Sequence, residues 1–293
     1  MSANFAAATA RRAAPPVKLP PPAKDRGQGG LALLEEAVHL LRRAPLSVHL
    51  AWLAGAGPFI AGLLYFLNTM RWSAFAADQL PPATLGLALL FVWMKAWQAE
   101  AAGRLRAFRA GRAPAPLTTA RWLRMALNQA GVQPFGLFLI PAAFFVVIPF
   151  GWIFALFQNH CVLDDGAAAP AGALWKRALR QMGLRANQNH VALITLLPLA
   201  FFAWLNLFVA MALLPELLKM LFGVETPFTQ AGGWTAIKMV FNSTFISVSL
   251  ALAWLALDPL IKACYVLRCF YGESLSSGED LRADLRALQA TAT

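Results

Sequence analysis

The chain has 293 residues, of which 59% are hydrophobic and only 13% are charged, and its formal net charge is +11. Soluble domains have about a quarter charged residues, so this composition excludes a soluble globular protein. The basic residues lie between long apolar runs rather than along one soluble face, which favours a lipid bilayer with anionic headgroups as partner and argues against nucleic acid.

Residues 1–30 are rich in alanine and proline and carry basic side chains. Such a segment cannot bury enough apolar surface to order itself, so we predict a disordered tail. No apolar stretch follows its arginine pair, so it is not a cleavable signal peptide. The next segment, LALLEEAVHLLRRAP, has leucines on one face and charges on the other. It predicts an amphipathic helix on the membrane surface.

Two membrane spans are predicted next, at Leu46–Met70 and from about Leu80 to Ala102. Each is long enough to cross roughly 30 Å of hydrocarbon. The sequence GAGPF in the first span provides Gly55 and Gly57, small residues that permit close helix packing. Tryptophans near the end of the second span indicate a membrane interface.

The stretch from Trp122 to Leu163 allows two interpretations, because it contains the sequence IPFG at Ile148–Gly151. It is either one long span or a tight hairpin, with a longer helix up to Val147 and a shorter one from Pro149. Proline removes a backbone donor and readily ends a helix, so the chain can turn back there.

The distribution of positive charge favours the hairpin. With it, 22 of the 25 lysines and arginines fall on one side of the membrane, leaving Arg71, Lys219 and Lys238 on the other. With a single span, the last eight of those 22 would cross the membrane. Because loops rich in lysine and arginine stay in the cytoplasm, we predict an even number of crossings and cytoplasmic termini.

A basic amphipathic helix is predicted between the hairpin and the fifth span. Its polar face carries Lys176, Arg177 and Arg180, which we expect to contact anionic lipid headgroups, although a solvated helix covering the bundle is the alternative. The fifth span is expected at about Val191–Leu214, and the sixth begins near Thr235 and is unusually long.

The predicted architecture is therefore all-α, a polytopic helical membrane bundle of about six transmembrane segments with interfacial amphipathic helices. Its parts are the tail (1–30), the membrane domain (31–272) and a charged C-terminal helix (273–293). Ser277 is expected to cap the first turn of that helix. Asp280, three residues later, is expected to make the reciprocal contact of a capping box.

The tripeptide Gln-Asn-His occurs twice, ending at His160 and at His190. The hairpin would place both histidines at a similar depth, where they could bind a ligand together with Cys161, Asp164 or Asp165. No spacing puts two ligands on one helical face. Asparagine and glutamine satisfy backbone groups at helix ends, so capping is the favoured interpretation.

Asp258 and Lys262 are spaced to share one face of the last span. Ionisable residues inside a membrane are candidates for function, here proton or ion coupling. Counting from Thr235 puts Asp258 beyond a full crossing, so an ion pair near the headgroups is expected. If Asp258 were deep, Asn206 and Asn242 would be its expected polar neighbours.

Catalytic motifs are missing. The chain has no GxSxG, P-loop or HExxH sequence. Its three cysteines form no CxxC pair, and their odd number argues against a disulfide framework. We therefore predict a protein that is not an enzyme and that uses no metal or cofactor.

The segments IPFGWIFALFQNHCVLDDGAAAPAGALWKRALRQ and DPLIKACYVLRCFYGESLSSGEDLRADL resemble the membrane domain attached to some bacterial glycerophosphodiester phosphodiesterases, and related multi-pass families. In those phosphodiesterases catalysis belongs to a separate soluble barrel. The resemblance covers about the C-terminal half and implies a six-helix membrane fold without a hydrolytic site. The matching positions are Pro149, Asp165, Gly166, Ala178, Leu179, Arg180, Arg268, Tyr271, Gly278, Asp280 and Leu281.

The expected function is a scaffold or partner subunit of an envelope-related complex, with protein partners in the membrane. A small transporter or lipid-handling protein that uses intramembrane polar residues is the alternative. Arginine far outnumbers lysine and alanine is plentiful, which suggests a GC-rich bacterial genome. The expected location is the bacterial inner membrane, with the N-terminus in the cytoplasm.

Overall fold

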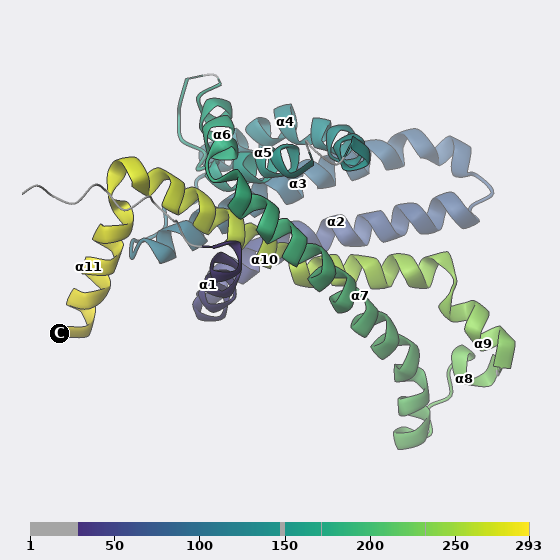
Figure 1. Ribbon diagram of the computed structural model, residues 1–293. Coiled ribbons are helices and arrows are strands. Elements are labelled where there is room, and N and C mark those ends of the chain that lie inside the picture. The colour runs from purple at the N-terminus through teal and green to yellow at the C-terminus, as the bar shows by residue number, and fades with distance from the viewer. Residues whose placement is uncertain (1–28, 147–149, 171, 232, 293) are drawn as a thin grey trace, which may run out of the picture.

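The computed structural model describes residues 29–146, 150–170, 172–231 and 233–292, so most of the predicted tail lies outside the described residues. The described residues form helices and no strand (Figure 1). The helices are α1 (Gly30–Arg43), α2 (Leu46–Trp72), α3 (Ala76–Arg109), α4 (Thr119–Val146), α5 (Phe150–Leu163), α6 (Ala173–Gly183), α7 (Ala186–Phe222), α8 (Pro227–Ala231), α9 (Gly233–Val240), α10 (Ser243–Ser277) and α11 (Glu279–Ala292).

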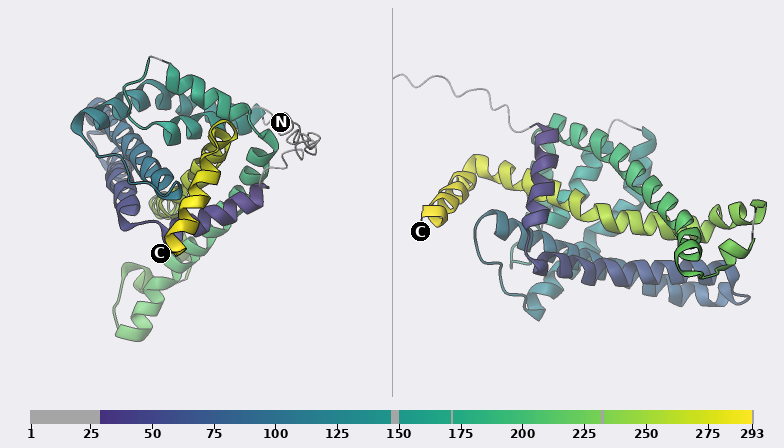
Figure 2. Two further views of the ribbon diagram at one scale, coloured as in Figure 1. Left: turned by 90° about the vertical axis from the view of Figure 1, so that its left-hand side faces the viewer. Right: turned by 90° about the horizontal axis from the view of Figure 1, so that it is seen from below.

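Five of these helices are long and apolar enough to cross a membrane: α2, α3, α4, α7 and α10. The prediction of an all-α, multi-pass membrane protein is confirmed. Helices α2, α3 and α10 extend in one general direction from a common end, and α7 diverges from α10 towards α8 and α9 (Figures 1 and 2). We call the common end the base; it comprises α1, α6 and α11 with the adjoining ends of α3, α4 and α10.

The predicted hairpin is present as α4 and α5, which run antiparallel. The Nε2 of Gln133 donates to the carbonyl of Phe157 over 3.1 Å, and the rings of Phe144 and Phe150 lie 5.3 Å apart. The turn at residues 147–149 lies outside the described residues. With 14 residues, α5 is about 21 Å long, shorter than the roughly 30 Å hydrocarbon layer. The fold thus has five long spans and one short returning helix.

Two predicted boundaries differ from the structure. The sixth span begins not near Thr235 but at Ser243, because the side chain of Asn242 caps α10 by accepting from the backbone N–H of Thr244. The last span also continues past residue 272, to Ser277. The chain turns there at Gly278, which has a positive φ of 64°.

The basic segments gather at the base, as the charge count predicts. Arg109 at the end of α3 pairs with Glu36 of α1 (3.0 Å), and Arg112 pairs with Glu279 of α11 (2.6 Å). At the opposite end, Arg71 donates to the side-chain oxygen of Asn242. The two ends of the bundle therefore differ strongly in positive charge.

Close packing of α2 on α3 depends on Gly55. A Cβ at this position would lie 2.6 Å from the Cβ of Trp97 and 3.1 Å from the carbonyl of Met94. Gly57, two residues on, faces open space, with only a leucine methyl at 3.9 Å. Only one of the two glycines in GAGPF is thus required by an interhelical contact.

We expect Gly55→Ala to lower the free energy of unfolding by about 1–3 kcal/mol, the usual effect of overpacking. Gly57→Ala is the matched control and should leave stability unchanged or raise it, because alanine favours a helix more than glycine does. Thermal unfolding in detergent measures both variants. Equal stability of the two variants would contradict this account of the α2–α3 contact.

Labelling of one introduced cysteine at a time, in intact cells, tests which ends of the helices lie on the same side of the membrane. Cys161, Cys264 and Cys269 are buried, so background labelling should be low. We expect Lys176→Cys and Ala287→Cys to react from the same side of the membrane, and Val224→Cys from the other. Labelling of Lys176→Cys and Val224→Cys from one side would contradict the topology.

Candidate functional site

A buried carboxylate ties three helices together inside the bundle. The Oδ2 of Asp258 on α10 accepts from the indole N–H of Trp52 on α2 and from the Nε2 of Gln98 on α3, each over 2.8 Å. Fifteen residues separate Asp258 from the start of α10 at Ser243, about 22 Å along the helix. The carboxylate therefore lies well within the bundle.

Lys262 lies one turn after Asp258, as predicted, and its Nζ is 4.0 Å from Asp258 Oδ1. The same ammonium donates to the side-chain oxygen of Gln158 on α5 over 2.6 Å. Lys95 on α3 is within electrostatic range of both charges. We call Trp52, Lys95, Gln98, Gln158, Asp258 and Lys262 the inner polar cluster.

The expected ion pair is present. Its side chains are only 5% (Asp258) and 6% (Lys262) exposed, so both are buried between helices. Asn206 and Asn242, the neighbours suggested for a deep Asp258, are elsewhere. The first bonds the carbonyl of Phe202, and the second caps α10 at its far end.

The inner polar cluster leaves little free space. A cavity of about 20 Å³ touches Trp52, Gln98 and Lys262, which is room for about one water molecule. Asp258 has two hydrogen-bond donors and a cation around it. The inner polar cluster therefore links the helices through satisfied polar groups and leaves little room for a ligand.

Among the described contacts, the asparagines of the two tripeptides bridge helices and do not cap them, so for these residues the favoured interpretation was wrong. Asn159 lies inside α5, and its oxygen accepts from Arg268 (3.4 Å) and from the thiol of Cys269 (3.3 Å) on α10. Asn189 lies inside α7, where it accepts from the hydroxyl of Tyr265 (2.6 Å) and donates to the carbonyl of Gly151 (2.7 Å). Both asparagines link separate helices.

The two histidines do not converge. The ring of His190 packs against Trp152 near the start of α5, whereas His160 packs against Trp175 of α6 near the end of α5. Residues 152 and 160 are about 12 Å apart along that helix. Among the described residues, no group of three or more His, Cys, Asp or Glu side chains is placed to hold a metal ion. The two histidines are therefore not placed to bind one ligand together.

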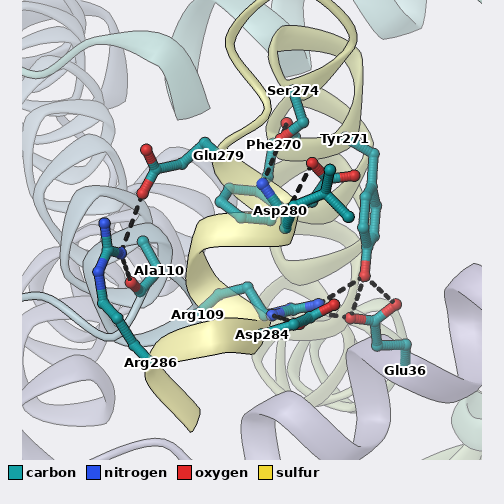
Figure 3. A network of polar contacts seen from close by, with 11 residues as sticks. Glu36, Arg109, Ala110, Phe270, Tyr271, Ser274, Glu279, Asp280, Asp284 and Arg286 are labelled. Carbon is teal, nitrogen blue, oxygen red and sulfur yellow. Dashed lines mark hydrogen bonds and ion pairs between the residues drawn. The ribbon is translucent and has the colours of Figure 1, made fainter. Parts of the chain in front are cut away.

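A second polar network joins the elements of the base (Figure 3). The hydroxyl of Tyr271 donates to Glu36 (2.7 Å) and accepts from Arg109 (2.8 Å), which joins α10, α1 and α3. The hydroxyl of Ser274 accepts from the backbone N–H of Asp280 (3.1 Å) and thereby caps α11. The predicted cap, Ser277, instead donates to the carbonyl of Glu273.

The turn at Asp165 and Gly166 positions two arginines of α4. Arg121 donates to the carbonyl of Asp165 (2.8 Å) and Arg124 to that of Gly166 (2.7 Å). Gly166 has a positive φ of 65°, and a Cβ there would meet Arg121 at 2.7 Å. Both observations require glycine at this position.

Asp164, next to this turn, is buried and hydrogen-bonded. Burial raises the pKa of its carboxyl group above the ordinary value, while donors from Gln129, Asn128 and the Gly166 backbone act in the opposite direction. The bonds from Gln129 (2.7 Å) and Asn128 (3.1 Å) hold the end of α5 against α4, and the bond from Gly166 (3.1 Å) closes the turn.

The predicted headgroup contacts on α6 divide into two groups. Lys176 and Arg180 are exposed. Arg177 is half-buried and pairs with Glu273 (2.7 Å) and Asp165 (3.8 Å). The first two residues remain candidates for headgroup contact, whereas Arg177 fastens α6 to α10.

Sequence reasoning missed the partners of Asp258, above all Trp52 and Gln98, and the fully buried Glu100. Gln98 and Glu100 were detectable as polar residues within or next to a predicted span, where an unsatisfied group is costly. The role of Trp52 could not be predicted from the sequence in this way, because tryptophan is also common at membrane interfaces.

Several positions of the resemblance gather at the base, among them Gly166, Arg268, Tyr271 and Gly278. Comparison with protein-family models, curated proteins and solved structures gave no match. The site must therefore be interpreted from its own geometry.

A double-mutant cycle tests the inner polar cluster. Breaking one partner of a buried ion pair leaves the other charge unpaired, which costs about 3–5 kcal/mol. We expect Asp258→Asn and Lys262→Met each to lower stability strongly, and the double variant to lose less than the sum of both. Thermal unfolding in detergent is the measurement. Purely additive losses would show that the two side chains do not interact.

Proposed function

We propose that this protein is a non-catalytic scaffold or partner subunit of an envelope-related complex in the bacterial inner membrane. The base and both termini would face the cytoplasm, an orientation supported by the positive charge gathered at the base. The observation that carries the proposal is an exposed leucine face on α11.

One face of α11 is held firmly on the base. Ala283 is buried against the neighbourhood of Phe270 and Ala110. Arg286 donates to the carbonyl of Ala110 and pairs with Glu279 (3.0 Å), as Figure 3 shows. These contacts fix the direction in which the helix presents its other face.

The opposite face of α11 exposes large apolar side chains. Leu281 and Leu285 are 73% and 56% exposed, and Leu288, one turn further, is 69% exposed. Residues four and three apart lie on one side of a helix, so they form a stripe. A rigid helix with such a stripe is suited to bind an apolar groove or helix of another protein.

Protein fits this stripe better than lipid does. In Figures 1 and 2, α11 lies beyond α1, at the end of the molecule away from the spans. Its charged residues are Glu279, Asp280 and Asp284 against Arg282 and Arg286, and both arginines lie within ion-pair distance of Glu279. Helices that lie on anionic membranes instead carry an excess of lysine and arginine on the polar face, as α6 does.

A transporter or lipid-handling protein is the second candidate, supported by the buried charges of Asp258 and Lys262. Charges inside a membrane protein are often functional. Here both side chains already have protein partners, and the adjoining cavity is only about 20 Å³. This arrangement favours a structural role for the two charges, in linking helices, over a role in the transport of a substrate.

Two leucines of equal exposure allow a matched test. Leu285 on α11 and Leu275 near the end of α10 are both 56% exposed. We expect wild-type protein, purified in mild detergent, to retain a protein partner at a fixed ratio. Leu285→Gln should reduce that partner at least about fivefold, since a central contact contributes more than 1 kcal/mol. Leu275→Gln should retain it. Quantitative mass spectrometry of the purified complexes provides the measurement.

Equal loss in both variants would contradict docking through α11. A preparation with no protein partner at a fixed ratio, but with one bound lipid or small molecule per chain, would favour the second candidate instead.

A further inference from the structure

A cavity of about 450 Å³ opens at the base, between the ends of α3 and α10, the start of α4, and α6. This volume is in the range of small-molecule sites, about 300–1,000 Å³. Five arginines and three carboxylates line it, so positive charge is in excess: Arg104, Arg106, Arg112, Arg121, Arg177, Asp165, Glu273 and Glu279.

Four of the five arginines are held by carboxylates. Arg112 pairs with Glu279, and Arg177 with Glu273. The other two pairs share one acid: the buried Glu100 accepts from Arg104 (2.7 Å) on one oxygen and lies 2.8 Å from Arg121 on the other. One carboxylate thus anchors two guanidinium groups at the cavity.

Arg106 is the exception. It lies on α3, is half-buried and lines the cavity. Within the described ranges of the chain, its side chain has no ion-pair or hydrogen-bond partner. A guanidinium group has five N–H donors and no acceptor, so an arginine in such a place favours an anionic ligand.

We propose that this cavity binds a phosphate group, with Arg106 as the main contact. Arginine forks match the oxygens of phosphate, often through two parallel hydrogen bonds. Arg104 is bound to Glu100 through its Nε, which leaves its terminal N–H groups available for a second contact. The cavity is larger than phosphate alone requires, so the ligand carries a substituent.

The phosphate has two possible sources, which share this chemistry: the headgroup of an anionic phospholipid and a soluble phosphate ester. The site is independent of the scaffold role, because it uses the inner wall of the base rather than the leucine face of α11.

Two binding measurements on the full-length protein in detergent distinguish the sources. One is calorimetric titration with glycerol 3-phosphate, and the other is native mass spectrometry with phosphatidylglycerol against phosphatidylcholine. We expect one of the two phosphate probes to bind, and Arg106→Gln to weaken it about tenfold or more, since hydrogen bonds to charged groups are strong. Arg71→Gln removes the same charge from an exposed position at the end of the bundle opposite the base and should change affinity less than about twofold.

A second variant covers the case in which Arg106→Gln does not fold. Ala113 is exposed and lines the cavity, so Ala113→Glu adds a negative charge without disturbing a core contact. It should weaken binding to a similar extent. Binding of glycerol 3-phosphate alone would identify a soluble ester, and binding of phosphatidylglycerol alone a lipid headgroup. Failure of both probes to bind, equal losses in Arg106→Gln and Arg71→Gln, or full affinity in Ala113→Glu would overturn the proposal.

Discussion

The carboxylate of Asp258 is the contact on which the arrangement of the spans depends. It accepts from Trp52 and Gln98, and Lys262 extends the same cluster to Gln158 on α5. Helices in a bilayer gain little from apolar contact, because lipid tails are equally apolar. Polar groups that would otherwise remain unsatisfied therefore select which helices lie together, and at which depth.

The base uses the same principle closer to water. Glu36, Tyr271 and Arg109 join three helices, and Glu100 holds two arginines at one wall of a cavity. Since these contacts fix α11 and the arginines in place, the base presents two surfaces of different character. One is the apolar stripe of α11, and the other is the basic cavity.

Much of the fold could be predicted from the sequence, and the site much less. The α4–α5 hairpin followed from a proline and from the sorting of charge, because both act locally or on whole loops. The roles of Asn159 and Asn189 could not be predicted from such local or loop-level properties. An asparagine at a helix end and one that bridges two helices look alike in sequence, since the difference lies in what packs opposite.

The amino-acid sequence alone predicts that this chain crosses a membrane several times as helices, and that nearly all its positive charge lies at one end. Apolar run length and charge are properties of segments, so they can be determined without knowing which helices are neighbours. The three-dimensional arrangement was needed to show that Asp258 is buried, that His160 and His190 are apart, and that five arginines line a cavity. Those facts depend on the rotation and depth of each helix against its neighbours, which packing and interhelical hydrogen bonds determine.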